Sequence, residues 1–133
     1  MISHWEEFGP GPTPRKDDRL HVTLNRKNTI LINGNVHALL GHPAAVVLLF
    51  DKLNSIIGIN PVPETRPNGF PVLAQRAGRH RLIRATPFCR YFGIRMDTTT
   101  AFLTPEIDDD GVLRLDLKMT SPLRRSSIGK RQR

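Results

Sequence analysis

The chain has 133 residues and a mass of 15.0 kDa, which suits one compact domain and is too short for two ordinary ones. Twenty Lys and Arg against twelve Asp and Glu give a net charge of +8, which favours a polyanionic partner such as nucleic acid. A single cysteine excludes an intrachain disulfide and a cysteine-rich zinc site. No apolar run is long enough for a signal peptide or a membrane span, so we expect a cytoplasmic protein.

Both ends of the chain are expected to lie outside the folded domain. Residues 1–20 include the segment 9–14, where proline alternates with other residues, and such a segment sustains neither a helix nor a central strand. We therefore expect a flexible Pro/Gly arm. Residues 119–133 carry many cations and few apolar side chains, which is typical of a disordered basic tail. A single β-rich domain is predicted over residues 21–118.

The first unit of this domain covers residues 21–62. Its polar turn Asn25–Asn28 lies between two segments of strand-like pattern and predicts a hairpin. Apolar residues at helical spacing then predict a short helix that Asn33 or Asn35 caps and Gly41 ends. The expected elements, in chain order, are strands at 21–24 and 29–32, a helix over 36–40, and strands at 45–50 and 55–59.

A proline-rich linker at 63–78, with at most a short edge strand at 70–73, leads to a second unit at 79–118. The second unit repeats the helix spacing of the first, because Phe88, Tyr91, Phe92 and Gly93 are spaced as Val36, Leu39, Leu40 and Gly41 are. Its expected elements are a strand at 82–83, a helix over 88–92, a strand around Phe102 and a strand at 112–117. The sequence therefore predicts a mainly β fold with two short helices, in which duplicated β-α-β-β units form a small swapped-hairpin-like barrel.

Residues 21–62 resemble the AbrB/MazE/SpoVT class of swapped-hairpin DNA-binding domains. The matching features are Val22-Thr23-Leu24, the turn Asn25–Asn28, Thr29–Ile32, Leu39-Leu40-Gly41, Val46–Phe50, Asp51 and Ile57–Pro61. In that class two units interleave around one core, either as a homodimer or within one chain as in the MraZ-like branch. The resemblance implies DNA contacts by Arg26 and Lys27, although this chain has Asn28-Thr29 where the family typically has Gly-Arg.

Arginines accumulate where acids are missing. No acidic residue lies between Glu64 and Asp97, and the arginines there are Arg66, Arg76, Arg79, Arg81, Arg84, Arg90 and Arg95. The planar guanidinium group donates two hydrogen bonds at once to a phosphate, so this pattern favours a phosphate-binding surface. Two alternatives stay open: the arginines pair with Asp108–Asp110, or with an acidic partner subunit.

No candidate catalytic or metal site emerges. The run Glu106–Gly111 is similar to a calcium loop, but Leu117 stands where the bidentate Glu is required, and Asp110-Gly111 is a strong hairpin turn. Cys89 has no His or acid at a spacing that indicates a nucleophilic pair, so we expect a structural role for it. We expect no enzyme, no metal and no cofactor.

Two functions remain as hypotheses. The first is a small DNA-binding regulator, with DNA a better candidate than RNA, that forms a homodimer and binds phosphates through cations of the turn, the arginine-rich segment and the tail. These residues are Arg26, Lys27, Arg76, Arg79, Arg81, Arg84, Arg90, Arg95, Arg124 and Arg125. The second is a non-enzymatic subunit or adaptor of a larger assembly of phage or mobile-element type, with RNA as a candidate component of that assembly.

Overall fold

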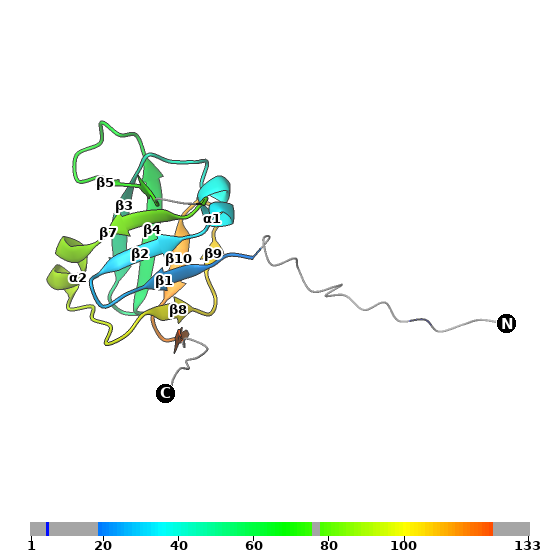
Figure 1. Cartoon of the computed structure of the whole chain (residues 1–133), viewed down its shortest axis with the longest axis vertical. Helices are drawn as coiled ribbons and strands as arrows, with labels where there is room; N and C mark the ends of the chain where they lie inside the picture. Colours follow the sequence, from blue (N-terminus) through cyan, green and yellow to red (C-terminus); the bar gives the residue numbers. More distant parts are fainter. Residues whose placement is uncertain (1–4, 6–18, 76–77, 124–133) are drawn as a thin grey trace.

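The computed structural model describes residues 5, 19–75 and 78–123 (Figure 1). These residues form two antiparallel sheets and two short helices. Sheet A has the strand order β11-β8-β1-β2-β7-β6, and sheet B has the order β5-β3-β4-β10-β9. The elements are β1 (Val22–Leu24), β2 (Thr29–Ile32), α1 (Gly34–Leu39), β3 (Ala45–Asp51), β4 (Ile56–Val62), β5 (Phe70–Pro71), β6 (Leu73–Ala74), β7 (Arg81–Arg84), α2 (Thr86–Phe92), β8 (Thr100–Phe102), β9 (Glu106–Ile107), β10 (Leu113–Asp116) and β11 (Thr120–Pro122).

The predicted mainly β class with two helices is confirmed, but neither sheet closes into a barrel. Sheet A lies in front of sheet B in Figure 1, and one hydrophobic core fills the space between them. Sheet A ends at β11 and β6, and sheet B ends at β5 and β9. Three of these edge strands are only two residues long, and short edge strands limit pairing with other chains.

The core is built from the inward side chains of the central strands. Ile30 of β2 and Ile83 of β7 stand directly opposite each other, and both are completely buried. Ile57 and Ile59 of β4 play the same part in sheet B. Burying a side chain of this size contributes roughly 1.5–3 kcal/mol. The alternating apolar pattern of the sequence thus corresponds to the inner faces of both sheets.

The β1–β2 turn is shaped by its asparagines, as the polar turn predicted. The side-chain Oδ1 of Asn25 accepts hydrogen bonds from the backbone N–H of Lys27 (2.9 Å) and Thr29 (3.0 Å). Asn28 adopts a left-handed conformation with φ 64°. Asn tolerates this region far better than most residues, so it suits this position of the turn.

Both helices stop where glycine was expected to stop them. The side chain of Asn33 caps α1 by accepting a hydrogen bond from the N–H of Val36 (3.1 Å), which decides between the two predicted caps. Gly41 after α1 and Gly93 after α2 have φ of 88° and 67°. Glycine adopts such values without steric cost, so both glycines act as helix stops.

Some strands differ from their predicted limits. β4 runs through Pro61 to Val62. Its neighbour β10 pairs only with Ile56–Ile59, so on that side no strand lies beside Pro61. The proline is tolerated because no hydrogen bond from its missing N–H is needed there. Thr120–Pro122 form β11 on the edge of sheet A, beyond the expected end of the domain at residue 118. The predicted arm lies outside the described residues, except for Trp5, Arg19 and Leu20. No helix of the described part is long and apolar enough to cross a bilayer.

Candidate nucleic-acid interface

The cations of the β1–β2 turn lie next to those of α2. The backbone N–H of Ala85, just before α2, donates to the carbonyl of Asn28 (2.8 Å), and the hydroxyl of Thr86 lies 3.5 Å from the carbonyl of Lys27. Arg84, at the end of β7, stands opposite Thr29 of β2. Segments 57 residues apart in the chain, around positions 27 and 84, are therefore in contact.

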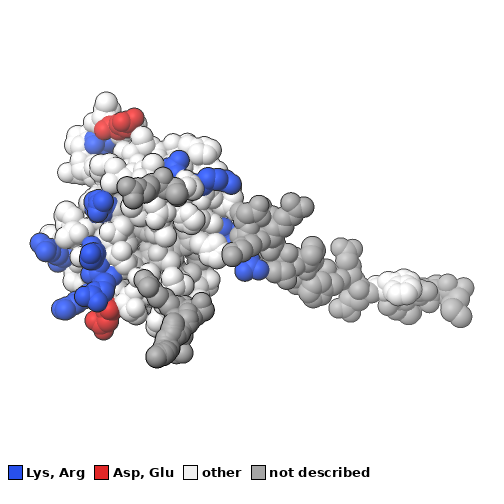
Figure 2. All heavy atoms as spheres, in the orientation of Figure 1, with Lys and Arg blue, Asp and Glu red and all other residues white. Residues whose placement is uncertain are grey.

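We call the exposed cations of this region the α2 basic surface. Its members are Arg26, Lys27, Arg84, Arg90 and Arg95, all of them exposed. Figure 2 shows Lys and Arg side chains gathered over α2 and the β1–β2 turn. None of the five lies within 4.0 Å of a carboxylate among the described residues. The cations of this surface therefore keep their charges available for an external anion.

Arg79 and Arg81 lie at the other end of β7, beside α1. β7 has four residues, so its two ends are about 10 Å apart. The guanidinium of Arg81 donates to the backbone carbonyls of Arg79 and His80, both at 3.0 Å, and this bonding holds the loop that precedes β7. The predicted single arginine cluster is thus divided between two places, and Arg81 has a structural role as well. Arg76, Arg124 and Arg125 lie outside the described residues.

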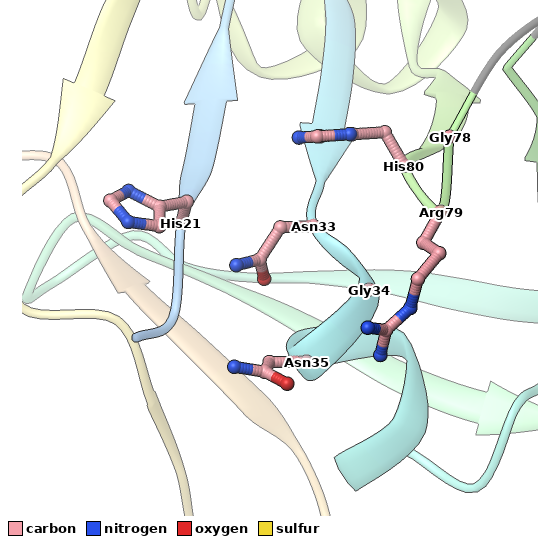
Figure 3. Close-up of a pocket in the computed structure, with 7 residues that line it drawn as sticks. All are labelled: His21, Asn33, Gly34, Asn35, Gly78, Arg79 and His80. Atoms are coloured by element: carbon pink, nitrogen blue, oxygen red, sulfur yellow. The ribbon is translucent and has the colours of Figure 1, made fainter. Parts of the chain in front are cut away.

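An open pocket of about 520 Å³ adjoins Arg79 (Figure 3). It is lined by His21, Asn33, Gly34, Asn35, Gly78, Arg79 and His80. Gly34 is required here by packing, because a Cβ at this position would lie 2.8 Å from the Cβ and the Nε of Arg79. Among the described residues, the lining contains one guanidinium and no carboxylate, so the pocket suits an anionic group better than a cation.

The acidic residues gather on the other sheet. Among the described residues, sheet B and its turns carry seven acids, which are Asp51, Glu64, Glu106, Asp108, Asp109, Asp110 and Asp116. The carboxylates of Glu106 and Asp108 each lie 4.0 Å from the guanidinium of Arg114, a residue of the same sheet. The described part therefore gives no support to the alternative in which Asp108–Asp110 neutralise the arginines between residues 66 and 95.

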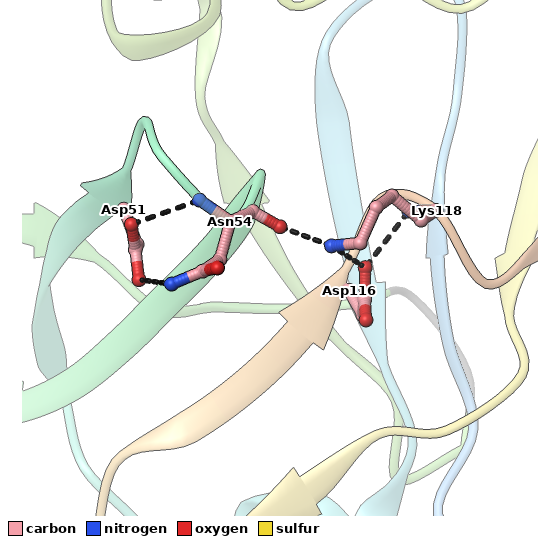
Figure 4. Close-up of polar contacts among 4 residues, drawn as sticks. All are labelled: Asp51, Asn54, Asp116 and Lys118. Atoms are coloured by element: carbon pink, nitrogen blue, oxygen red, sulfur yellow. Dashed lines mark hydrogen bonds and ion pairs between the residues drawn. The ribbon is translucent and has the colours of Figure 1, made fainter.

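Two of these acids also serve local structure (Figure 4). The side chain of Asn54 donates to Asp51 (2.8 Å), and this hydrogen bond is the main reason why the pKa of Asp51 lies below its usual value. Lys118 pairs with Asp116 (2.8 Å) and also donates to the carbonyl of Asn54. Hydrogen bonding by Lys118 lowers the pKa of Asp116 in the same way. These carboxylates stay ionised on the side of sheet B.

The residues that would carry chemistry in an enzyme are not grouped. No set of three or more His, Cys, Asp or Glu residues in the described ranges is close enough to hold a metal ion. Cys89 lies in α2 with 1% of its surface exposed, and desolvation raises the pKa of its thiol to about 11. The predicted hairpin turn in the acidic run Glu106–Gly111 is confirmed. The side chain of Asp108 accepts a hydrogen bond from the N–H of Val112 (3.0 Å), and Gly111 has φ 80°.

Two features of the described surface were not predicted from the sequence. One is the pocket, whose lining comes from three separate segments that only the sheet pairing brings together. The other is the ring of Tyr91, which is 82% exposed, although its spacing placed it with the core residues Phe88 and Phe92. A helical spacing of i, i+3 and i+4 marks one face of a helix, but the outermost residue of that face can still lie in water.

Comparisons with known proteins give no match for this chain: no protein family, no characterised protein and no solved structure. The AbrB/MazE/SpoVT resemblance of residues 21–62 is therefore neither supported nor contradicted by them. The function is inferred below from the geometry and charge of the described side chains.

Proposed function

We propose that this protein binds nucleic acid, most simply as a DNA-binding regulator, and that the α2 basic surface contacts phosphates. The observation that carries the proposal is that these cations have no carboxylate partner among the described residues. They lie on sheet A and its helices, whereas all the described acids except Asp97 lie on sheet B and its turns. The free-energy cost of binding an external phosphate is smaller at a cation without a carboxylate partner, because no existing ion pair has to be broken.

The separation of charge also orients the molecule. Among the described residues, sheet A with its helices and connections carries eight cations and one acid, and sheet B with its turns carries four cations and seven acids. The field of such a molecule attracts a polyanion to sheet A and repels it from sheet B. An orienting field raises the association rate with the correct face, and salt weakens it.

We further infer that the fold is an internal duplication, with corresponding positions 52 residues apart. Thr29–Ile32 of β2 corresponds to Arg81–Arg84 of β7, and α1 begins at residue 34 as α2 does at residue 86. β2 and β7 pair antiparallel so that Thr29 faces Arg84 and Ile32 faces Arg81, the register expected for two equivalent strands about a two-fold axis. β4 and β10 also pair antiparallel in sheet B, but there Ile56 corresponds to Leu113, a shift of 57 residues, because the second unit has a longer connection before its last strand.

The duplication is incomplete. β3 and β8 follow α1 and α2 respectively, yet β3 belongs to sheet B and β8 to sheet A. In sheet B the place beside β10 is taken by β9 instead. This exchange keeps the two sheets open and gives the two basic regions different surroundings. The α2 side carries the five cations of the α2 basic surface, whereas the α1 side carries the pocket with Arg79.

A charge reversal tests the proposed function. We expect Arg84→Glu to weaken binding of random-sequence duplex DNA by roughly tenfold or more at low salt, because it removes one phosphate contact and adds a repulsive charge. The matched control is Arg66→Glu, an equally exposed arginine in the connection after β4. The measurement is a titration by fluorescence anisotropy at several salt concentrations.

The wild type should show an affinity that falls steeply with salt, and Arg84→Glu should show a shallower slope. Equal losses for Arg84→Glu and Arg66→Glu would mean that only net charge matters and that the α2 basic surface is no specific site. If the wild type binds neither duplex DNA, single-stranded DNA nor RNA at low salt, the proposal fails. The second hypothesis, an adaptor that docks on an acidic protein surface, then becomes the better one.

A further inference from the structure

The aromatic ring of Tyr91 is presented to solvent from a rigid base. Its centroid lies 4.8 Å from that of Phe92 with the planes at 87°, an edge-to-face arrangement. Phe92 in turn contacts Phe50 of β3 (5.0 Å) and Phe88 (5.2 Å), which is buried in the core. Such aromatic pairs add stability beyond their buried area and favour the observed edge-to-face orientation. Tyr91 thus has one aromatic neighbour at its base while 82% of it is exposed.

Two cations of the α2 basic surface, Arg84 and Arg90, lie on or just before the short helix that carries this ring. α2 has seven residues and is about 10 Å long. Arg90 is the neighbour of Tyr91 on the helix, and Arg84 lies two residues before the helix starts. Thr86, in the first turn, approaches the carbonyl of Lys27. The ring and these cations thus fit along about three nucleotides of one strand, since stacked nucleotides are about 3.4 Å apart.

We propose that the α2 basic surface binds single-stranded nucleic acid, with the ring of Tyr91 as the platform on which one unpaired base stacks. This inference rests on the proposed nucleic-acid function and specifies its substrate class. A base inside a duplex has both faces covered by its neighbours and offers nothing to an exposed tyrosine. An unpaired base offers a free face, and stacking on an aromatic side chain strengthens binding substantially without sequence preference.

The cations contribute affinity through phosphate contacts. In the proposed complex, Arg84, Arg90 and Lys27 contact the phosphates on either side of the stacked base. The phosphate contacts then provide the electrostatic attraction, and stacking on the ring provides the selectivity for a single strand. The first unit has no equivalent surface. Leu39 occupies the position of Tyr91 on α1 and is 64% exposed, but an aliphatic side chain has no flat face for a base.

The test uses the full chain with a labelled oligothymidylate and with a duplex of the same length, at low salt. We expect Tyr91→Ala to weaken single-strand binding by about 5- to 100-fold and to change duplex binding by less than about twofold. Tyr91→Phe keeps a ring and should stay within about threefold of the wild type on both. Leu39→Ala is the matched control on α1 and should change neither.

Four outcomes overturn the inference. They are an unchanged single-strand affinity in Tyr91→Ala, an equal loss on the duplex, a loss in Tyr91→Phe as large as in Tyr91→Ala, and an equal loss in Leu39→Ala. In each of these cases the wild type still binds nucleic acid, and the proposed function stands. If the wild type binds neither the single strand nor the duplex, both proposals are wrong. Urea unfolding of each variant confirms that Tyr91 and Leu39, being exposed, can be changed without loss of the fold.

Discussion

Cys89 and Arg81 each illustrate how neighbours decide what one residue does. Cys89 stands beside Arg90 in the sequence, a setting that would favour the thiolate if both side chains met in water. In α2 the thiol faces the core and Arg90 faces solvent, so burial dominates and raises the pKa to about 11. Arg81 was grouped with the phosphate-binding arginines, yet its guanidinium is used for two backbone carbonyls.

The thiol of Cys89 is expected to be unreactive in the folded protein. At about pH 8, a pKa of about 11 leaves roughly one thiol in a thousand as thiolate, against about a quarter for an ordinary cysteine. Alkylation by iodoacetamide should therefore be at least about 100-fold slower in the native protein than in concentrated urea. Mass spectrometry after timed quenching measures both rates. Similar rates would show that α2 opens readily or that the thiol is not buried.

At the scale of the element, α1 depends on its two ends. Asn33 satisfies the start of the helix, and its side-chain amide also donates to the carbonyl of Arg19 (2.8 Å), which fixes the chain that enters β1. Near the other end, the Nε2 atom of His37 lies 3.0 Å from the carbonyl of Pro43, a bond that needs the proton on Nε2. The ring of His37 also contacts His42 edge to face at 5.1 Å.

Acid should destabilise the fold through His37. Burial is the main cause that lowers its pKa from 6.5, and the charges of Arg81 and His42 act in the same direction. A histidine with a lowered pKa in the folded state binds fewer protons there than in the unfolded chain. The contribution of neutral His37 to the free energy of unfolding is therefore fully present above pH 6.5. It is lost as the pH falls from 6.5 toward the folded-state pKa.

The variant His37→Gln keeps an N–H donor for the carbonyl of Pro43 but does not titrate. We expect its urea midpoint to change less between about pH 7.5 and about pH 5.5 than that of the wild type. His80→Gln, an exposed histidine, serves as the control and should retain the full pH dependence. A drop in His37→Gln as large as in the wild type would assign the effect to other groups.

At the scale of the whole molecule, the two sheets enclose one core and divide the charge. β10 leads out of sheet B, and the chain then crosses to the edge of sheet A as β11. There the N–H of Leu103 donates to the carbonyl of Met119 (2.8 Å), and the N–H of Leu123 donates to that of Thr99 (2.8 Å). β11 thus covers β8, which would otherwise be the open edge.

Removing β11 tests its part in the fold. A chain that ends at residue 118 should be less stable than one that ends at residue 123 by about 2–4 kcal/mol, because each backbone hydrogen bond contributes about 0.5–1.5 kcal/mol. The comparison is made by urea unfolding, and the chain of 123 residues controls for loss of the last ten. Equal stability would show that the domain ends at residue 118, as the sequence alone predicted.

The sequence by itself determined the local structure. Alternating apolar residues located the strands, and asparagines and glycines set the turns and the helix ends, because these effects act over a few residues. The tertiary structure decided which segments meet. The pairing of β2 with β7 divides the arginines between two places, and the packing of α2 on Phe50 leaves the ring of Tyr91 exposed. Strand pairing and side-chain packing depend on residues far apart in the chain, so no local pattern specifies them.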